Sequence, residues 1–172
     1  MGKVPRMLAI HDMSCVGRCS LTAVLPVTAA CGIQAVPLPT AVFSNHLAFA
    51  YGARTDFTEH MISFMDAWDR NGIRFDAVYS GYLASPAQAG IVKEAIGRYA
   101  GGGVLVMVDP AMADFGRLYT GYTENMVAAM RELTARAHII KPNYTEACML
   151  AERPYEEKMP SPQQLKKLMD DL

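Results

Sequence analysis

The chain has 172 residues, of which 51% are hydrophobic and 19% are charged. This composition supports one domain with a substantial core and excludes a disordered polymer. The net charge of −1 and the pI near 6.4 provide no electrostatic surface for nucleic acid or for an anionic membrane. The longest apolar runs, such as 104–108, are too short to cross a membrane. The four cysteines form no CxxC pair and no signal-peptide layout precedes the first apolar run, so a reduced protein of the cytoplasm is expected.

Apolar runs of strand length alternate along the chain with segments of helical period. Strands are predicted at 7–10, 33–37, 76–79, 104–108 and 138–140, and helices at 19–31, 56–71, 85–99, 123–136, from 143, and from 161. This alternation, with nearly continuous apolar strands, predicts an α/β fold in which helices cover both faces of a mostly parallel sheet. Residues 1–172 are predicted to form a single domain.

Two segments depart from the regular alternation. Residues 38–57 lack clear periodicity and contain Pro39, Gly52 and several polar residues; we predict a long loop or flap over a ligand, because loops of that length are usually functional. The last helix runs to Leu172 without a C-cap glycine, where βαβ logic expects a further strand. We therefore expect the architecture to be truncated before its C-terminal strands and helices.

Polar residues follow most of the predicted strands. In open α/β sheets, ligands bind beyond the carboxyl ends of the strands, so the candidate ligand positions are the segments 11–20, 40–46, 80–82, 109–114 and 141–146. Each has a structural alternative. Gly17 is equally typical of a simple tight turn, and Asn143 with Glu146 three residues later is also a helix-capping pair. A capped helix start and an anion site are compatible readings.

No segment matches a GxxxxGK[ST] phosphate loop, a GxGxxG fingerprint, GxSxG, HExxH or an EF-hand. The residues alone therefore predict an α/β protein with a polar, acid-containing crevice for a small ligand, without identifying that ligand.

Five segments, in this order, resemble the pyridoxal/pyridoxine/pyridoxamine kinase family of the ribokinase-like superfamily. They are AIHDMSCVGRCSLTAVLPV, PLPTAVFSNH, FDAVYSGYLAS, VMVDPAMADFGRLY (similar to that family's VDPVMGD-x-G-x-LY) and KPNYTEACML (similar to its TPN-x-x-E). The resemblance covers about residues 7 to 155. It implies a ribokinase-like fold, a homodimer, and ATP-dependent phosphorylation of the 5′-hydroxyl of a B6 vitamer with Mg²⁺.

The resemblance also assigns roles to residues. It implies that Asp12 and Thr40 lie near the pyridine ring, that Tyr82 packs against that ring, and that Ser14 and His46 belong to the same pocket. Asp109 is implied near the transferring phosphate and its metal. Asn143 and Glu146 are implied to hold Mg²⁺ against the ATP phosphates, largely through water.

The chain departs from the family pattern in three places. Lys141 replaces the usual Thr before Pro-Asn, so that it either adds positive charge beside the phosphates or is simply solvated. Ala113 replaces a Gly, which matters if that position needs a positive φ. The family's Gly-Thr-Gly-Asp-type segment, which provides an anion hole and the catalytic base, is not found in these 172 residues. We therefore expect this chain alone to be a poor kinase.

Three alternatives to a B6 kinase stay open at this point. The first is a hydroxymethylpyrimidine kinase, an enzyme of the same superfamily that acts on a similar flat heterocycle. The second is a non-catalytic B6-binding or dimerisation module. The third is a truncated product with an exposed core.

Overall fold

The computed structural model describes residues 3–158 and 160–172. Its six-stranded sheet has the order β3-β2-β1-β4-β5-β8, and all neighbouring strands are parallel except β2 and β3. The strands are β1 (Arg6–Ser14), β2 (Gln34–Phe43), β3 (Arg54–Asp56), β4 (Ala77–Ser80), β5 (Leu105–Val108) and β8 (Ile139–Ile140). A separate short hairpin consists of β6 (Ala113–Asp114) and β7 (Arg117–Leu118).

Six helices accompany the strands: α1 (Leu21–Ala30), α2 (Thr58–Arg70), α3 (Pro86–Tyr99), α4 (Glu124–Thr134), α5 (Tyr144–Leu150) and α6 (Pro162–Asp170). All the helices and strands predicted from periodicity are present at the predicted places, with ends shifted by a few residues. Among the described residues, no helix is both long enough and apolar enough to span a membrane.

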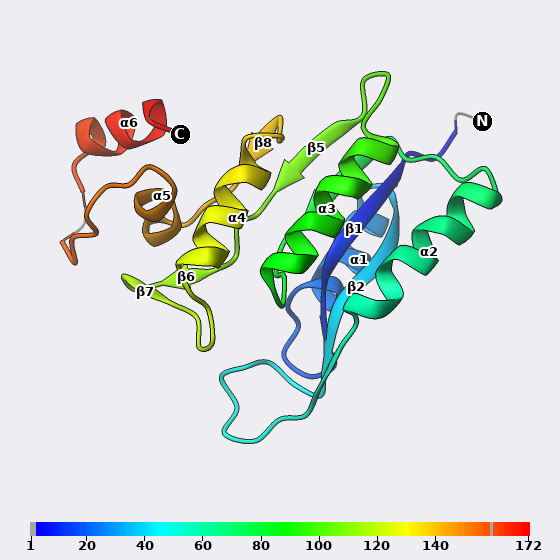
Figure 1. Cartoon of the computed structure of the whole chain (residues 1–172), viewed down its shortest axis with the longest axis horizontal. Coiled ribbons are helices and arrows are strands. Elements are labelled where there is room, and N and C mark those ends of the chain that lie inside the picture. The colour runs from blue at the N-terminus through cyan, green and yellow to red at the C-terminus, as the bar shows by residue number, and fades with distance from the viewer. Residues whose placement is uncertain (1–2, 159) are drawn as a thin grey trace.

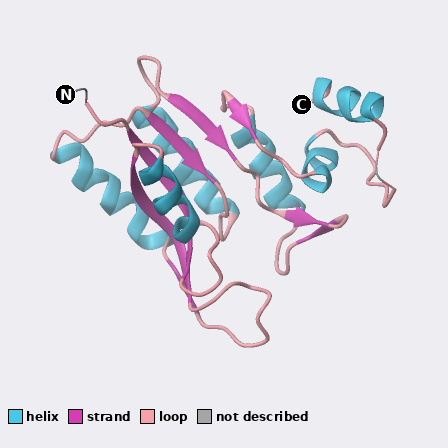
Figure 2. Cartoon of the chain, turned by 180° about the vertical axis from the view of Figure 1, so that it is seen from behind, coloured by secondary structure: helices cyan, strands magenta, loops and turns pink. Residues whose placement is uncertain are grey.

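Helices lie on both faces of the sheet, as predicted, but they do not cover them equally. In Figure 1, α2, α3 and α4 lie in front of the sheet and α1 lies behind it, and Figure 2 shows the α1 side. The main core lies between the sheet and the α2–α4 layer; among its fully buried members are Leu8, Ile10, Val78, Val106, Met61, Val92 and Met130. On the α1 side, Leu105 and Ile139 are each 45% exposed, so the β5–β8 half of that face is bare in the described chain.

The prediction of a loop or flap at 38–57 is wrong at both ends of that segment. β2 continues through Phe43, and residues 54–56 return as the antiparallel edge strand β3. Pro37 and Pro39 hid the strand in the sequence because proline cannot donate to a ladder. Being two residues apart, the prolines place both missing donors on one edge of β2. There, β3 pairs only with residues 41–43. Residues 44–53 are the loop that remains.

Candidate active site

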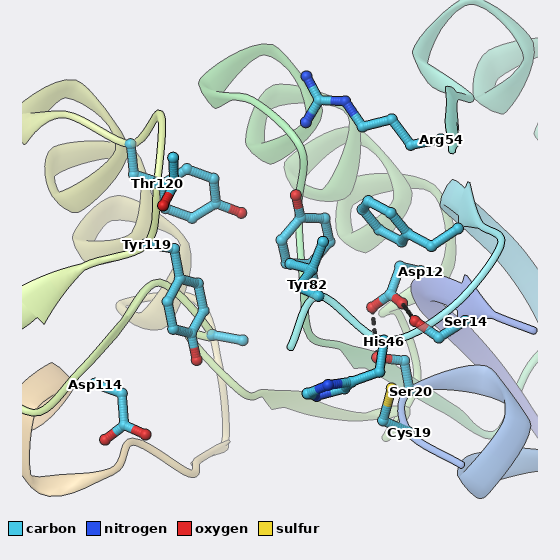
Figure 3. Close-up of a pocket in the computed structure, with 14 residues that line it drawn as sticks. Asp12, Ser14, Cys19, Ser20, His46, Arg54, Tyr82, Asp114, Tyr119 and Thr120 are labelled. Carbon is cyan, nitrogen blue, oxygen red and sulfur yellow. Dashed lines mark hydrogen bonds between the residues drawn. The ribbon is translucent and has the colours of Figure 1, made fainter. Parts of the chain in front are cut away.

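Asp12 lies near the carboxyl end of β1, beside an irregularity in the sheet. The pairing of β1 with β2 shifts between His11↔Pro39 and Met13↔Val42, so that β2 carries one extra residue opposite Asp12. Such bulges bend a strand and redirect its side chains. Asp12 is 4% exposed. Its Oδ2 accepts a hydrogen bond of 2.9 Å from Ser14 Oγ, and its Oδ1 accepts one from Ser20 Oγ (Figure 3).

The turn between β1 and α1 closes against the loop that follows β2. Gly17 has a φ of 125°, and a Cβ there would lie 2.5 Å from His46 Cβ, so this close approach requires glycine. His46 N donates to the Val16 carbonyl at 2.7 Å. The glycine turn therefore also fixes the position of His46, which goes beyond the simple tight-turn reading.

A cavity of about 620 Å³ opens beside these residues, at the carboxyl ends of β1, β2 and β4. Asp12, Ser14, His46 and Tyr82 line it, with five further residues of the candidate segments: Cys19, Ser20, Phe43, Ala111 and Asp114. The lining also includes residues outside those segments: Leu47, Arg54, Tyr119, Thr120 and Tyr122 (Figure 3). A cavity of this size is in the range of small-molecule sites.

Aromatic rings form one wall of the cavity. Tyr82 contacts Phe43 edge to face, with ring centroids 5.6 Å apart, and stacks on Tyr122 at 6.0 Å. Tyr122 also packs near Tyr119, at 5.9 Å, and its hydroxyl donates to the Leu83 carbonyl. These contacts join the β4–α3 loop to the segment between β7 and α4, and they present flat apolar surface to a ligand.

Burial keeps the hydroxyls of this wall protonated. Burial raises the pKa of Tyr119 to about 12, and it is also the main cause that raises the pKa of Tyr82 and of Tyr122. Near neutral pH these side chains are therefore hydrogen-bond donors and carry no charge.

Thr40 is the one predicted substrate residue that does not line the cavity. Its side chain is fully buried, and its hydroxyl donates to the Tyr82 carbonyl at 2.9 Å. Thr40 lies at the β2 irregularity and its side chain points into the protein interior. It therefore fixes the backbone of Tyr82 and does not face the cavity. Gln88 supports this arrangement by donating to the Thr40 carbonyl at 2.8 Å.

The carboxyl ends of β5 and β8 carry a second group of charges outside the cavity, close to His11 of β1. Asp109 Oδ2 forms a salt bridge of 3.0 Å with Lys141 Nζ, and the hydrogen bond with Asp109 raises the pKa of Lys141. His11 is 4% exposed with an unpartnered Nε2; burial, and secondarily the charge of Lys141, lowers its pKa to about 3. Lys141 thus contacts Asp109 instead of being simply solvated.

Asn143 and Glu146 form a full capping box at the start of α5. Asn143 Oδ1 accepts from Glu146 N at 2.9 Å, and Glu146 Oε2 accepts from Asn143 N at 2.8 Å. Glu146 Oε1 also accepts from Met112 N at 3.1 Å. Glu146 is 2% exposed, and burial raises its pKa despite these backbone donors. The capping interpretation is confirmed, and the metal role of both residues stays a prediction.

The Gly-to-Ala departure at position 113 has a simple structural answer. Ala113 is absent from the described residues with positive φ, which in the β6–β7 turn are Phe115 and Gly116. Ala113 is fully buried and its backbone accepts from Asn143 Nδ2 at 2.7 Å. The alanine therefore introduces no backbone strain.

The sequence predictions thus divide into two spatial groups. Asp12, Ser14, His46 and Tyr82 line one cavity, whereas Asp109, Asn143 and Glu146 lie at neighbouring strand ends outside it. Tyr119 and Tyr122 were missed. The signal that could have found Tyr119 is its place in the FGRLY stretch directly after the β6–β7 turn, because such loops at the carboxyl ends of strands carry ligand contacts.

The fold has close relatives among solved structures. A putative phosphomethylpyrimidine kinase from Bacteroides thetaiotaomicron superposes with a TM-score of 0.94 and 39% identity over 99% of this chain and 60% of that protein. A second crystal form of it, with pyridoxal, gives a TM-score of 0.92. Pyridoxal kinase from Lactobacillus plantarum gives 0.87 at 32% identity, covering 98% of this chain and 60% of that one.

The sequence itself matches curated proteins over part of their length. It is 32% identical over 133 residues to pyridoxal kinase PdxY of Paraburkholderia phymatum and 35% identical over 133 residues to that of Burkholderia lata. Each match covers 73% of this chain and 45% of the relative. No protein-family model matches the sequence.

The sheet order, the helical layers and the polar strand ends define a ribokinase-like α/β protein. Within this superfamily the chain is similar in sequence and fold to pyridoxal kinases. It spans a little under half the length of the curated relatives that it matches.

Proposed function

We propose that the protein to which this chain corresponds phosphorylates the 5′-hydroxyl of a B6 vitamer with ATP, and that this chain supplies the vitamer site. The observation that carries the proposal is the cavity in which the Asp12 carboxylate, its two serine donors and the ring of Tyr82 meet. A flat heterocycle with polar substituents matches that combination of stacking surface and fixed hydrogen-bonding groups.

The strand ends beside the cavity supply the charges that a phosphate donor needs. Asp109 and Lys141 lie at the carboxyl ends of β5 and β8, where nucleotides bind in open α/β folds. Phosphoryl transfer depends on positioning and on stabilisation of charge. We assign Asp109 a supporting role there. The catalytic base is unassigned, because the Gly-Thr-Gly-Asp-type segment is not among these residues.

The donor set at this edge fits Mg²⁺ only as a hydrated ion brought by the nucleotide. The Asp109 side chain is 20% exposed, whereas both Glu146 oxygens accept from backbone N–H groups. Within residues 3–158 and 160–172, no group of three or more His, Cys, Asp or Glu side chains is gathered for a metal. One carboxylate with several waters is a common arrangement for Mg²⁺. Asp109 would therefore hold the ion, and Glu146 would attract it through its charge without ligating it.

The test separates binding from turnover in the 172-residue chain. Calorimetric titration with pyridoxal, pyridoxine and pyridoxamine should show binding, which the Tyr82→Ala variant weakens. Formation of pyridoxal 5′-phosphate from pyridoxal and ATP, followed by chromatography, should be slow or undetectable. Absence of vitamer binding would overturn the proposal, and rapid turnover would overturn the expectation that the missing segment supplies the base.

The same experiments distinguish two other functions. A kinase of the related hydroxymethylpyrimidine type is supported by the Bacteroides neighbour, which is named a putative phosphomethylpyrimidine kinase, although that protein was also crystallised with pyridoxal. Tighter binding of hydroxymethylpyrimidine than of any vitamer would select it. A non-catalytic B6-binding module is selected if vitamers bind and no fragment or partner restores turnover. The homodimer and the cytoplasmic location implied by the resemblance stay predictions.

A further inference from the structure

The Asp12 carboxylate is buried without a compensating cation. Its two oxygens accept from the hydroxyls of Ser14 and Ser20, and these donors are neutral. Within the described part of the chain, no salt bridge pairs Asp12 with a basic side chain. A carboxylate that is 4% exposed carries a large desolvation cost unless a positive charge or several strong donors approach it.

The rest of the cavity reinforces this demand for positive charge. Asp114 is a second carboxylate in the lining, and Arg54 is the one lysine or arginine among the described lining residues. Arg54 is exposed, and Figure 3 shows its guanidinium extending away from Asp12. The rings of Phe43, Tyr82 and Tyr122 complete the wall, and aromatic faces attract cations.

We infer that Asp12 is a specificity-determining residue that makes this site select B6 vitamers bearing a positively charged substituent over neutral ones of the same shape. The inference rests on the proposed function and deepens it. Pyridoxamine, with a protonated aminomethyl group, is the preferred vitamer. Pyridoxine, which carries a neutral hydroxymethyl group of nearly the same size at that position, binds more weakly. The two hydroxyl donors hold the carboxylate rigidly, so that little ordering is needed when the ligand arrives.

The test compares these two vitamers by calorimetry on the 172-residue chain. Wild type should bind pyridoxamine about tenfold more tightly than pyridoxine, the scale expected for one partly desolvated ion pair. Asp12→Asn keeps the shape of the side chain and removes its charge, so the ratio should fall to about one. Asp170→Asn, an exposed position on α6, removes a distant charge and should leave the ratio unchanged.

Each outcome decides the matter. Equal affinities in wild type, or a preference that survives in Asp12→Asn, would overturn the inference while leaving the vitamer site intact. Absence of binding by both vitamers would overturn the proposed function and this inference together. If Asp12→Asn does not fold, the wild-type ratio still decides, because the two vitamers differ in charge and hardly in shape. Added salt should lower the affinity for pyridoxamine more than that for pyridoxine.

Discussion

Gln88 is the buried side chain on which the most local structure depends. It is fully buried, and its amide nitrogen donates to the Thr40 carbonyl and to Thr58 Oγ1, both at 2.8 Å. Its amide oxygen accepts from Ala84 N at 2.7 Å. One side chain of α3 thus joins the end of β2, the start of α2 and the loop after β4.

We expect Gln88→Ala to lower the free energy of unfolding by about 2–4 kcal/mol. In Gln88→Ala the Thr40 carbonyl keeps a second donor, Phe57 N at 3.1 Å. The main group left without a hydrogen-bond partner is therefore the Ala84 N–H. An unpaired buried group costs about 1–3 kcal/mol, and the void left by the side chain adds to that. Gln88→Glu keeps the acceptor for Ala84 but places an oxygen against the Thr40 carbonyl, so it should destabilise at least as much.

The assay is equilibrium unfolding in urea, followed by the fluorescence of Trp68, which is the one tryptophan of the chain and packs edge to face on Phe75. Gln163→Ala, exposed on α6, is the matched control and should change stability by less than about 0.5 kcal/mol. A loss below about 1 kcal/mol for Gln88→Ala would refute the reasoning, because the three bonds would then be replaced at little cost.

Three further predictions concern the polar strand ends. A Cβ at Gly81 would lie 2.2 Å from His11 Nδ1, so Gly81→Ala should lower the free energy of unfolding in urea by about 1–3 kcal/mol. Adding His11→Ala should recover part of that loss. The pKa of His11 is lowered from 6.5 to about 3 in the folded state, so the unfolded chain binds the extra proton. Stability should therefore fall as the pH drops below about 6.5, by up to about 1.4 kcal/mol per unit; an equally steep fall between pH 7 and 5 in His11→Gln would contradict this. Removing the cation that faces Asp109 in Lys141→Thr should tighten Mn²⁺ binding about tenfold by spin-resonance titration, with Lys141→Arg as the unchanged control. The change should affect stability little because the Lys141 side chain is 64% exposed.

The regular part of the fold was predictable because its signals are local. Apolar runs such as 104–108 identify strands, and pairs such as Ser161 with Gln164 identify helix starts, from the local sequence alone. The second of these forms a capping box. Parallel strands then require their carboxyl ends to meet at one edge, which is why the segments 11–20 and 80–82 were candidate ligand positions. The shared pocket of Asp12, Ser14 and Tyr82 was implied by the family resemblance.

The remainder depends on contacts between distant segments, which periodicity does not report. The strand character of residues 38–43 comes from pairing with β1 and β3 and overrides the effect of Pro39. Tyr122 reaches the cavity wall because the β6–β7 hairpin directs the chain back to Tyr82. The partner of Lys141 is 32 residues away in sequence, so no local pattern distinguishes a paired lysine from a solvated one.

The two parts of the candidate site differ in how completely this chain builds them. At the cavity, the Asp12 carboxylate is held by two serine hydroxyls, and the backbone of Tyr82 is held by the buried Thr40 hydroxyl. A ligand therefore meets groups that are already in place. At the neighbouring edge, Asp109 has an exposed lysine as its salt-bridge partner, and His11 Nε2 and Ser80 Oγ are buried without partners. Transfer of a phosphoryl group requires fixed charges around the transferring oxygens, and one exposed lysine paired with Asp109 does not provide all of them. Recognition of a heterocycle is therefore the part of the chemistry for which these residues are organised, and phosphoryl transfer requires additional groups at the Asp109 edge.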